Sequence, residues 1–248
     1  MHCIRPVAGK ESTVQIQNAV ALVTGANRGL GRAIAEALLA RGARKVYAGV
    51  RQPERLDLPG VEPVRLDVTD PAAAAAAAAQ CGDVNLLVNN AGIARVIGFL
   101  DAQAADATRE IFETNLYGLI HMSQAFAPVL AANGGGAIAN VLSVASWINA
   151  GRLSVYAASK SAAWGFTNGL RNELRGQGTQ VVGLHVGFID TDLTKGFDVP
   201  KADARDVAAQ LLDGITEGQE EVLADDITRA VKQGLSQQPG IYLDPPQR

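Results

Sequence analysis

The stretch Ala19-Val-Ala-Leu-Val-Thr-Gly-Ala-Asn-Arg-Gly-Leu-Gly31 decides the fold of this 248-residue chain. It begins as an apolar run typical of a buried strand and ends in three glycines, Gly25, Gly29 and Gly31, where a helix is expected to begin. Glycine lets the backbone approach a phosphate closely, and the N–H groups at the start of a helix attract that phosphate. The spacing is not the usual G-x-G-x-x-G, but a glycine turn between a strand and a helix predicts a dinucleotide-binding loop.

Strand-like and helix-like segments alternate on either side of this loop. We expect strands at 19–24, 45–50, 64–67, 84–88, 137–142, 180–186 and 220–223, and helices at 29–40, 71–79, 107–131, 155–175, 204–214 and 226–235. Such alternation implies parallel strands joined by right-handed crossovers. The predicted fold class is therefore α/β, a doubly wound parallel sheet of the Rossmann type in three α/β/α layers. Residues 19–248 are expected to form a single domain, with residues 1–18 as a flexible lead-in.

Composition excludes several other classes of protein. The chain is 48% hydrophobic with a net charge of -3, so it has material for a large core and no basic excess for nucleic acid or an anionic membrane. It has no clean apolar run of about 20 residues that would span a membrane. Two cysteines and an N-terminus without an apolar signal core favour a cytoplasmic protein. The three histidines are scattered, and we expect no metal site.

The end of the second expected strand helps to choose the cofactor. An acidic residue there would bind the adenosine ribose of NAD, but the strand ends in Val50-Arg51. Arg51 and Arg28 are candidates to bind a 2′-phosphate, because guanidinium groups match phosphate oxygens, although either arginine alone is better explained as a solvated surface residue. We therefore expect NADP(H) in preference to NAD(H). Asp67 is a candidate for the adenine amino group, or equally for capping the turn before Thr69.

Tyr156-Ala-Ala-Ser-Lys160 is the strongest candidate for catalytic chemistry. On a helix, this spacing places the phenol and the ammonium one turn apart on the same face. A neighbouring positive charge favours the phenolate, so Lys160 is expected to lower the pKa of Tyr156 toward neutral. Tyr-x-x-x-Lys also occurs by chance on many helices, so the pair gains meaning only from the rest of the chain.

Five motifs together resemble the short-chain dehydrogenase/reductase family, in its order. They are Thr24 to Gly31, Asn89-Asn-Ala-Gly92, Asn115, Ser143, and Tyr156 with Lys160, and the resemblance extends from Ala19 to about Asp192. It implies four catalytic residues: Tyr156 as general acid or base, Ser143 bonding the same substrate oxygen, Lys160 holding the nicotinamide ribose, and Asn115 fixing a water that relays protons. Ser146 lies three residues beyond Ser143, but the spacing to Tyr156 favours Ser143. Asn89 would brace the central sheet.

The resemblance, together with the glycine loop and the two arginines, also implies which residues contact the cofactor. These are Gly25, Asn27, Arg28, Gly29, Leu30, Gly31, Arg51, Asp67, Val68, Asn90, Ala91, Gly92, Tyr156, Lys160, Gly187, Ile189 and Thr191. One departure from the family is Val186-Gly187, where Pro-Gly is common, which puts the rigidity of that loop in doubt. The chain also lacks the glycine-rich final strand of many tetrameric members, so a homodimer through the two long helices, or a monomer, is expected.

The substrate pocket is expected to be mostly apolar. Its expected lining is Ile93, Val96, Trp147, Ile148, Leu153, Phe188, Leu193 and Phe197. This composition favours an NADPH-dependent enzyme similar to carbonyl reductases, which reduces an apolar or aromatic ketone or aldehyde. Two alternatives remain: an NAD-linked dehydrogenase of a hydroxysteroid or other secondary alcohol, and a non-catalytic nucleotide sensor on the same fold. The intact set of four catalytic residues argues against a sensor.

Overall fold

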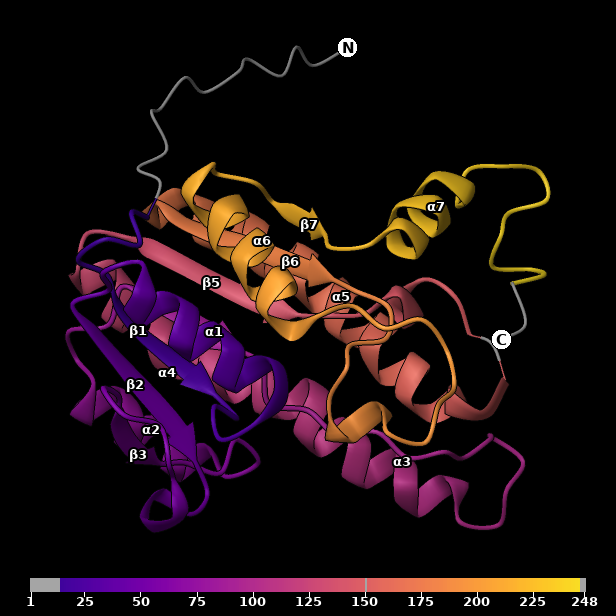
Figure 1. Cartoon of the computed structure of the whole chain (residues 1–248), viewed down its shortest axis with the longest axis horizontal. Helices are drawn as coiled ribbons and strands as arrows, with labels where there is room; N and C mark the ends of the chain where they lie inside the picture. The colour runs from indigo at the N-terminus through magenta and orange to yellow at the C-terminus, as the bar shows by residue number, and fades with distance from the viewer. Residues whose placement is uncertain (1–13, 150, 246–248) are drawn as a thin grey trace.

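A single parallel sheet forms the centre of the molecule (Figure 1). The computed structural model describes residues 14–149 and 151–245. Within them the strand order is β3-β2-β1-β4-β5-β6-β7, and each neighbouring pair is parallel. The strands are β1 (Val20–Thr24), β2 (Lys45–Val50), β3 (Glu62–Arg65), β4 (Leu86–Asn89), β5 (Gly136–Val141), β6 (Thr179–His185) and β7 (Glu221–Leu223). The expected α/β class and parallel sheet are confirmed.

Helices cover both faces of the sheet. They are α1 (Gly29–Ala40), α2 (Pro71–Gln80), α3 (Ala104–Phe112), α4 (Gly118–Ala132), α5 (Ser154–Leu174), α6 (Ala204–Thr216) and α7 (Asp226–Gly234). One apolar cluster joins α1 and α6 to one face, and a second joins α2, α4 and α5 to the other. The chain reverses its direction of winding between β1 and β4. In open sheets of this kind ligands bind beside the carboxyl ends of the strands at such a switch point.

Most of the expected elements lie within two residues of the observed bounds, and two of the differences bear on the site. The expected strand 64–67 is wrong by two residues, because β3 ends at Arg65, opposite Val50, and the chain then turns at Asp67. The expected helix 107–131 is divided into α3 and α4 by a π-helical segment, Glu113–Tyr117, that contains Asn115. A π turn widens the helix by one residue and is frequent at functional sites.

The start of the described chain is packed rather than loose. Val14 and Ile16 are buried in the cluster beneath α1 and α6, and the Asn18 N–H donates to the Gly42 carbonyl at 2.9 Å. The expected flexible lead-in is therefore wrong for residues 14–18, and residues 1–13 lie outside the described residues. The division into one domain stays a prediction. No helix within residues 14–149 and 151–245 has the length and apolar character to cross a bilayer.

Candidate active site

The turn between β1 and α1 is shaped by glycines. Gly25 and Gly29 have φ angles of +67° and +54°, which favour glycine, and a Cβ on Gly31 would collide with the Gly25 carbonyl oxygen. The first turn of α1 has no side-chain cap and no acidic residue. Its N–H groups and positive dipole end are thus left for an anionic group, and the turn fits the pyrophosphate of a dinucleotide.

Side chains from β1 and the segment after β4 hold this turn from behind. The Thr24 hydroxyl accepts from the N–H groups of Asn90 and Ala91, each at 3.0 Å. The Asn90 amide donates to the Thr24 carbonyl at 2.9 Å. Asn89 donates to Asn140 at 2.9 Å and so joins β4 to β5, as expected of a brace for the central sheet. The Asn90 side chain thus ties the segment after β4 to the backbone at the end of β1.

The arginines expected at the 2′-phosphate lie at the surface. Arg28 precedes α1, has a side chain 69% exposed, and lies 3.6 Å from Asp192. Arg51 follows β2 and is exposed, and its carbonyl accepts from Arg65, a third guanidinium that no sequence pattern indicated. Asp67 accepts from both the N–H and the hydroxyl of Thr69, at 3.0 and 2.8 Å, so it makes the turn-capping bond of its two expected roles.

Other residues expected at the cofactor differ in how accessible they are. Asn27 is exposed and lies in the glycine turn, whereas Leu30 and Val68 are buried in the two apolar clusters. The Val68 carbonyl lies 3.2 Å from Nδ1 of His121. The side chains of Leu30 and Val68 point into these clusters, so the predicted contact of each residue with a nucleotide would be made mainly by its backbone.

The segment after β6 faces the glycine turn from the opposite side. Thr191 Cγ2 would lie 3.2 Å from a Cβ on Gly29. Gly187 donates its N–H to the Asp225 carboxylate at 2.7 Å, and Asp225 also caps α7 through the Thr228 N–H at 2.9 Å. Ile189 pairs with Ala202 and closes the base of the loop. The anchor on α7 therefore supplies rigidity that the missing proline would have given. The only sequence signal for Asp225 is its position as a helix cap.

Ser143 follows β5 in an extended conformation and starts a short 3-10 turn, Val144–Ser146. Its hydroxyl oxygen accepts from the Ala145 N–H at 3.1 Å, which leaves the hydroxyl proton free to donate. Ser146 instead accepts from the Ser143 N–H at 3.3 Å. Of these two serines, Ser143 is the one whose side chain lowers the pKa of Tyr156.

Tyr156 and Lys160 occupy one face of the first turns of α5. Lys160 Nζ lies 5.8 Å from the centre of the Tyr156 ring and donates to the Val141 carbonyl at 2.8 Å. Burial raises the pKa of Tyr156 to about 12, against the lowering effect of the Ser143 hydrogen bond, and burial lowers the pKa of Lys160 to about 8. The expected lowering of the Tyr156 pKa by Lys160 is therefore wrong for the protein alone, because desolvation outweighs a lysine held on a carbonyl.

Asn115 connects the π-helical segment to the catalytic helix and to the loop after β4. Its amide nitrogen donates to the Ile93 carbonyl and the Ser159 hydroxyl, each at 2.9 Å, and its oxygen accepts from the Ile93 N–H at 2.8 Å. Ser159 donates in turn to the Tyr156 carbonyl at 2.7 Å. Asn115 and Lys160 both line a small cavity, and both lie within 4 Å of the position that a Cβ on Gly92 would occupy. Ser159 thus braces Asn115 against the first turn of α5.

The expected substrate wall divides into surface and core residues. Val96 and Leu193 are exposed, and the rings of Phe188 and Phe197 lie 5.1 Å apart within the loop after β6. Ile93, Ile148 and Leu153 are partly buried near the site. Trp147 does not fit the expectation. Its buried ring is stacked on His185, with centroids 4.0 Å apart, so it packs toward β6 and α7.

Comparison with known proteins agrees with this geometry. The family model described as short chain dehydrogenase matches residues 19–201. The 3-oxoacyl-acyl-carrier-protein reductase FabG of Escherichia coli is 35% identical over 192 residues, which cover 73% of this chain and 78% of that protein. Dehydrogenase/reductase SDR family member 7B of Bos taurus is 34% identical over 198 residues, covering 72% of this chain and 60% of that protein.

Solved structures are similar over nearly the whole chain. A short chain dehydrogenase from Burkholderia cenocepacia J2315 in complex with NADP superposes with a TM-score of 0.89 at 40% identity, covering 93% of this chain and 98% of that one. A short chain dehydrogenase/reductase from Burkholderia phymatum in complex with NAD gives 0.81 at 25% identity, covering 95% and 98%. The chain therefore belongs to the short-chain dehydrogenase/reductase family and is an NAD(P)-dependent oxidoreductase acting on CH–OH or C=O groups.

Proposed function

We propose that this enzyme is an NADPH-dependent carbonyl reductase that converts a ketone or aldehyde to an alcohol, with Tyr156 as the general acid. The observation that carries the proposal is the meeting of the Ser143 and Tyr156 side chains at the carboxyl edge of the sheet, with the Lys160 ammonium behind them. This edge also holds the glycine turn that fits a dinucleotide. When bound, the reduced nicotinamide supplies the hydride for the carbonyl carbon.

The protonated phenol of Tyr156 is the form that carbonyl reduction needs. With the pKa of Tyr156 raised by burial to about 12, the residue is a phenol at neutral pH and has a proton to give. Carbonyl reduction requires that proton on the substrate oxygen, whereas alcohol oxidation requires the phenolate. The reverse reaction would need the positive charge of an oxidised nicotinamide to lower the pKa of Tyr156.

Ser143 orients the substrate and Lys160 restores the proton. The Ser143 oxygen is already bonded by the Ala145 N–H, so its own proton is directed to the substrate oxygen, which gains negative charge as the reaction proceeds. Lys160 stays mostly protonated at neutral pH even though burial lowers its pKa to about 8. The cavity that Lys160 shares with Asn115 offers a place for a water that returns the proton to Tyr156.

NADPH is proposed in preference to NADH on the residues at the end of β2. No carboxylate is present between Val50 and Gln52, while Arg28 and Arg51 are exposed at the two turns that flank the adenosine side of the site. The similarity to the Burkholderia cenocepacia structure in complex with NADP supports this preference. The Burkholderia phymatum structure in complex with NAD keeps an NAD-linked dehydrogenase as the second candidate.

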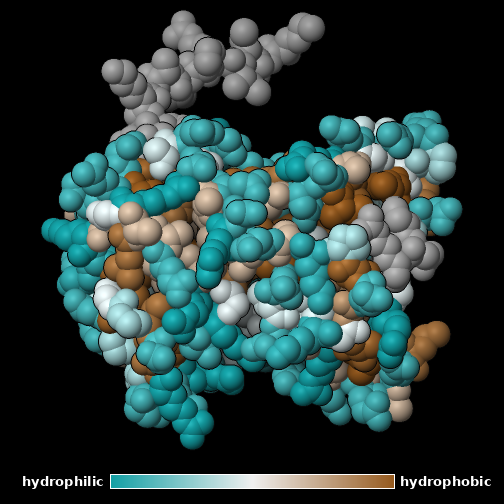
Figure 2. All heavy atoms as spheres, in the orientation of Figure 1, coloured by the Kyte–Doolittle hydropathy of each residue, from teal (hydrophilic) through white to brown (hydrophobic). Residues whose placement is uncertain are grey.

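An apolar or aromatic carbonyl compound is the proposed substrate class. Val96, Phe99, Leu100 and Leu193 are exposed apolar side chains on the loops after β4 and β6. Figure 2 shows hydrophobic atoms at the right-hand end of the molecule, which in Figure 1 holds α7 and the loop before α3, and smaller groups at the left. The reductase relatives are named for a 3-oxoacyl substrate, in which a ketone likewise forms part of an acyl chain. A homodimer and a cytoplasmic location stay predictions.

The test is an assay of NADPH and NADH oxidation with a panel of aryl ketones, aldehydes and 3-oxoacyl thioesters. We expect turnover with NADPH, a higher KM for NADH, and loss of turnover in the Tyr156→Phe variant. A preference for NAD⁺ with secondary alcohols would establish the second candidate instead. Tight nucleotide binding without consumption by any carbonyl or alcohol would identify a nucleotide sensor.

A further inference from the structure

We propose that His185 is a positioning residue that sets the direction of the Ser143 hydroxyl by holding the Ser143 carbonyl. The inference rests on the proposed function, in which Ser143 orients the substrate oxygen. His185 ends β6, is 0% exposed, and has no place in the chemistry described above. Its Nδ1 lies 3.3 Å from the Ser143 carbonyl oxygen.

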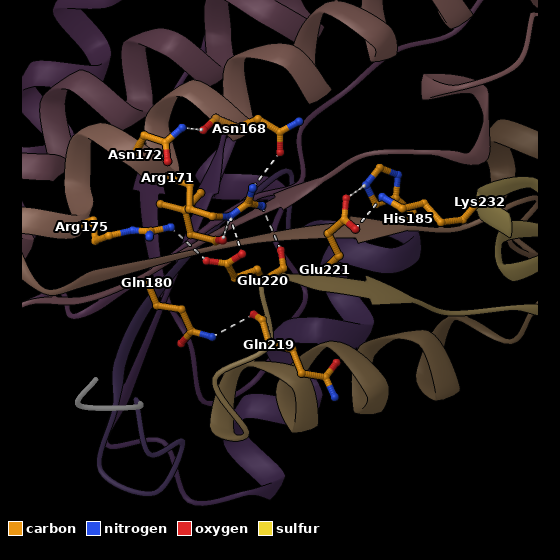
Figure 3. A network of polar contacts seen from close by, with 11 residues as sticks. Asn168, Arg171, Asn172, Arg175, Gln180, His185, Gln219, Glu220, Glu221 and Lys232 are labelled. Atoms are coloured by element: carbon orange, nitrogen blue, oxygen red, sulfur yellow. Dashed lines mark hydrogen bonds and ion pairs between the residues drawn. The ribbon is translucent and has the colours of Figure 1, made fainter. Parts of the chain in front are cut away.

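The neighbours of the imidazole define its tautomer. A carbonyl oxygen can only accept, so Nδ1 must carry a proton. Nε2 has no hydrogen-bond partner among the residues that the structure describes, and it lies 3.8 Å from a Glu221 carboxylate oxygen. Lys232 binds the other oxygen of Glu221 at 2.7 Å and neutralises it, as Figure 3 shows. A neutral ring with its proton on Nδ1 is the form that this arrangement favours.

Aromatic side chains prevent the ring from turning. The His185 and Trp147 rings are stacked, with centroids 4.0 Å apart and planes 17° apart. Trp164 meets Trp147 edge-on at 6.2 Å, and Lys232 Nζ lies 4.8 Å from the centre of the Trp147 ring. Because Trp147 follows the Ser143 turn and Lys232 lies on α7, the stack joins the catalytic turn to the last helix.

The Ser143 carbonyl belongs to the peptide unit directly before the one whose N–H holds the Ser143 hydroxyl. The same unit carries the Val144 N–H, which donates to the Val186 carbonyl at 2.9 Å. The next N–H, that of Ala145, holds the Ser143 hydroxyl oxygen at 3.1 Å. The Ser146 N–H donates to the same carbonyl at 3.0 Å, so the imidazole is the second donor to this oxygen. If the imidazole bond is lost, the two backbone bonds alone hold the peptide unit, and a tilt of the unit moves the donor that orients the hydroxyl. His185 therefore acts on the substrate only through Ser143.

Three substitutions separate positioning from packing. Asparagine places its amide near the position of Nδ1, glutamine places its amide near the position of Nε2, and leucine fills space without a donor. In the full chain with NADPH and an aryl ketone, we expect His185→Asn to keep kcat within about threefold of wild type. We expect the kcat of His185→Gln and of His185→Leu to fall by about 10- to 100-fold, which is the usual effect of a misplaced group on the rate. Affinity for NADPH should not change in the three variants, because the Gly187 N–H stays bonded to the Asp225 carboxylate and holds the segment after β6 in place.

Arg175→Ala is the matched control from the same polar network. It removes an exposed ion pair with Glu220 at 3.4 Å (Figure 3) and should leave kcat unchanged. The tautomer of His185, read from ¹⁵N chemical shifts of the wild-type protein, is the readout that needs no turnover.

The outcomes separate this inference from the proposed function. A proton on Nδ1, together with rescue by asparagine alone, supports it. A proton on Nε2, or a folded His185→Leu variant with the kcat of wild type, overturns it. If wild type turns over no carbonyl at all, the proposed function fails, and the tautomer alone then decides whether His185 holds Ser143.

Discussion

The turn after β1 and the turn after β5 lie at the same edge of the sheet, but they are built in different ways. The first depends on missing side chains: Gly31 has no room for a Cβ beside the Gly25 carbonyl. The second depends on side chains that come from distant parts of the chain: His185 lies against the Ser143 carbonyl, and the Ser143 side chain acts on the half-buried Tyr156. The first turn is proposed to hold the pyrophosphate of a nucleotide through its backbone, whereas the second requires a set of neighbours to hold one hydroxyl in place.

Removing the Ser143 hydroxyl should produce a large effect that leaves the first turn intact. Ser143→Ala is expected to lower kcat by about 100- to 1000-fold, the usual cost of losing one donor to a developing oxyanion. The dissociation constant for NADPH, measured by fluorescence titration, should stay the same. Ser146→Ala is the matched control. Its kcat should fall much less, because the Ser146 hydroxyl only accepts a hydrogen bond from the Ser143 N–H. Equal losses in both variants would show that the turn, and not the hydroxyl, matters.

Acid should weaken the second region through His185. Burial lowers the pKa of His185 to about 4, below its ordinary value of 6.5. Lys232 and Arg171 lower this pKa further, whereas Glu221 raises it. Between pH 6.5 and 4, His185 is therefore protonated in the unfolded chain but stays neutral in the folded protein. The contribution of neutral His185 to the stability of the fold is complete above pH 6.5 and is lost as the pH falls toward 4.

The size of this loss can be measured against a variant without the imidazole. A shift of this size corresponds to about 3 kcal/mol in the free energy of unfolding. Urea unfolding at pH 7 and pH 4.5 should show a larger acid loss for wild type than for His185→Asn. The same loss in both proteins would place the acid sensitivity elsewhere.

Filling the space at Gly31 should damage the first region alone. In Gly31→Ala the new methyl group would collide with the Gly25 carbonyl, and a backbone atom cannot move aside cheaply. We expect affinity for NADPH to fall by about 100-fold, or about 2.7 kcal/mol. Gly165→Ala is the control, since a methyl group there meets nothing within 4 Å. Unchanged nucleotide affinity in Gly31→Ala would contradict a backbone-built site.

The smallest expected effect concerns the choice between the two cofactors. Arg28→Ala and Arg51→Ala should each raise the KM for NADPH by about tenfold and leave the KM for NADH unchanged, because only NADPH carries the 2′-phosphate. Arg109→Ala, at an exposed ion pair with Asp106, is the control. If the double variant Arg28→Ala/Arg51→Ala still prefers NADPH, the cofactor argument is wrong.

The two turns also differ in how far the sequence alone could predict them. The glycines of the first turn are neighbours in the chain, so their spacing predicted a strand, a tight turn and a helix. The Tyr156–Lys160 spacing likewise placed both groups on one face of α5. The bond from His185 to Ser143 and the bond from Gly187 to Asp225 join residues 42 and 38 positions apart, and no local pattern indicates them.

Two further differences have local physical causes. The residues of the π-helical segment Glu113–Tyr117 are ordinary helix residues, so the helix around Asn115 read as continuous. The pKa of Tyr156 followed burial rather than the nearby lysine, because the sequence shows that a charge is close but not that the Val141 carbonyl holds it. The spacing in the sequence therefore predicted that Tyr156 and Lys160 lie close together, but the pKa of Tyr156 depends on how the site is packed.

A single-turnover experiment tests the central claim most directly. Wild type and Tyr156→Phe are each loaded with NADPH and mixed with an aryl ketone, and bound and oxidised NADPH are followed in the same sample. We predict equal binding, rapid oxidation by wild type, and oxidation at least about 1000-fold slower in the variant that lacks the acid. Equal binding with no oxidation by wild type, or equal oxidation by both proteins, would contradict a hydride-transfer site in which Tyr156 is the acid.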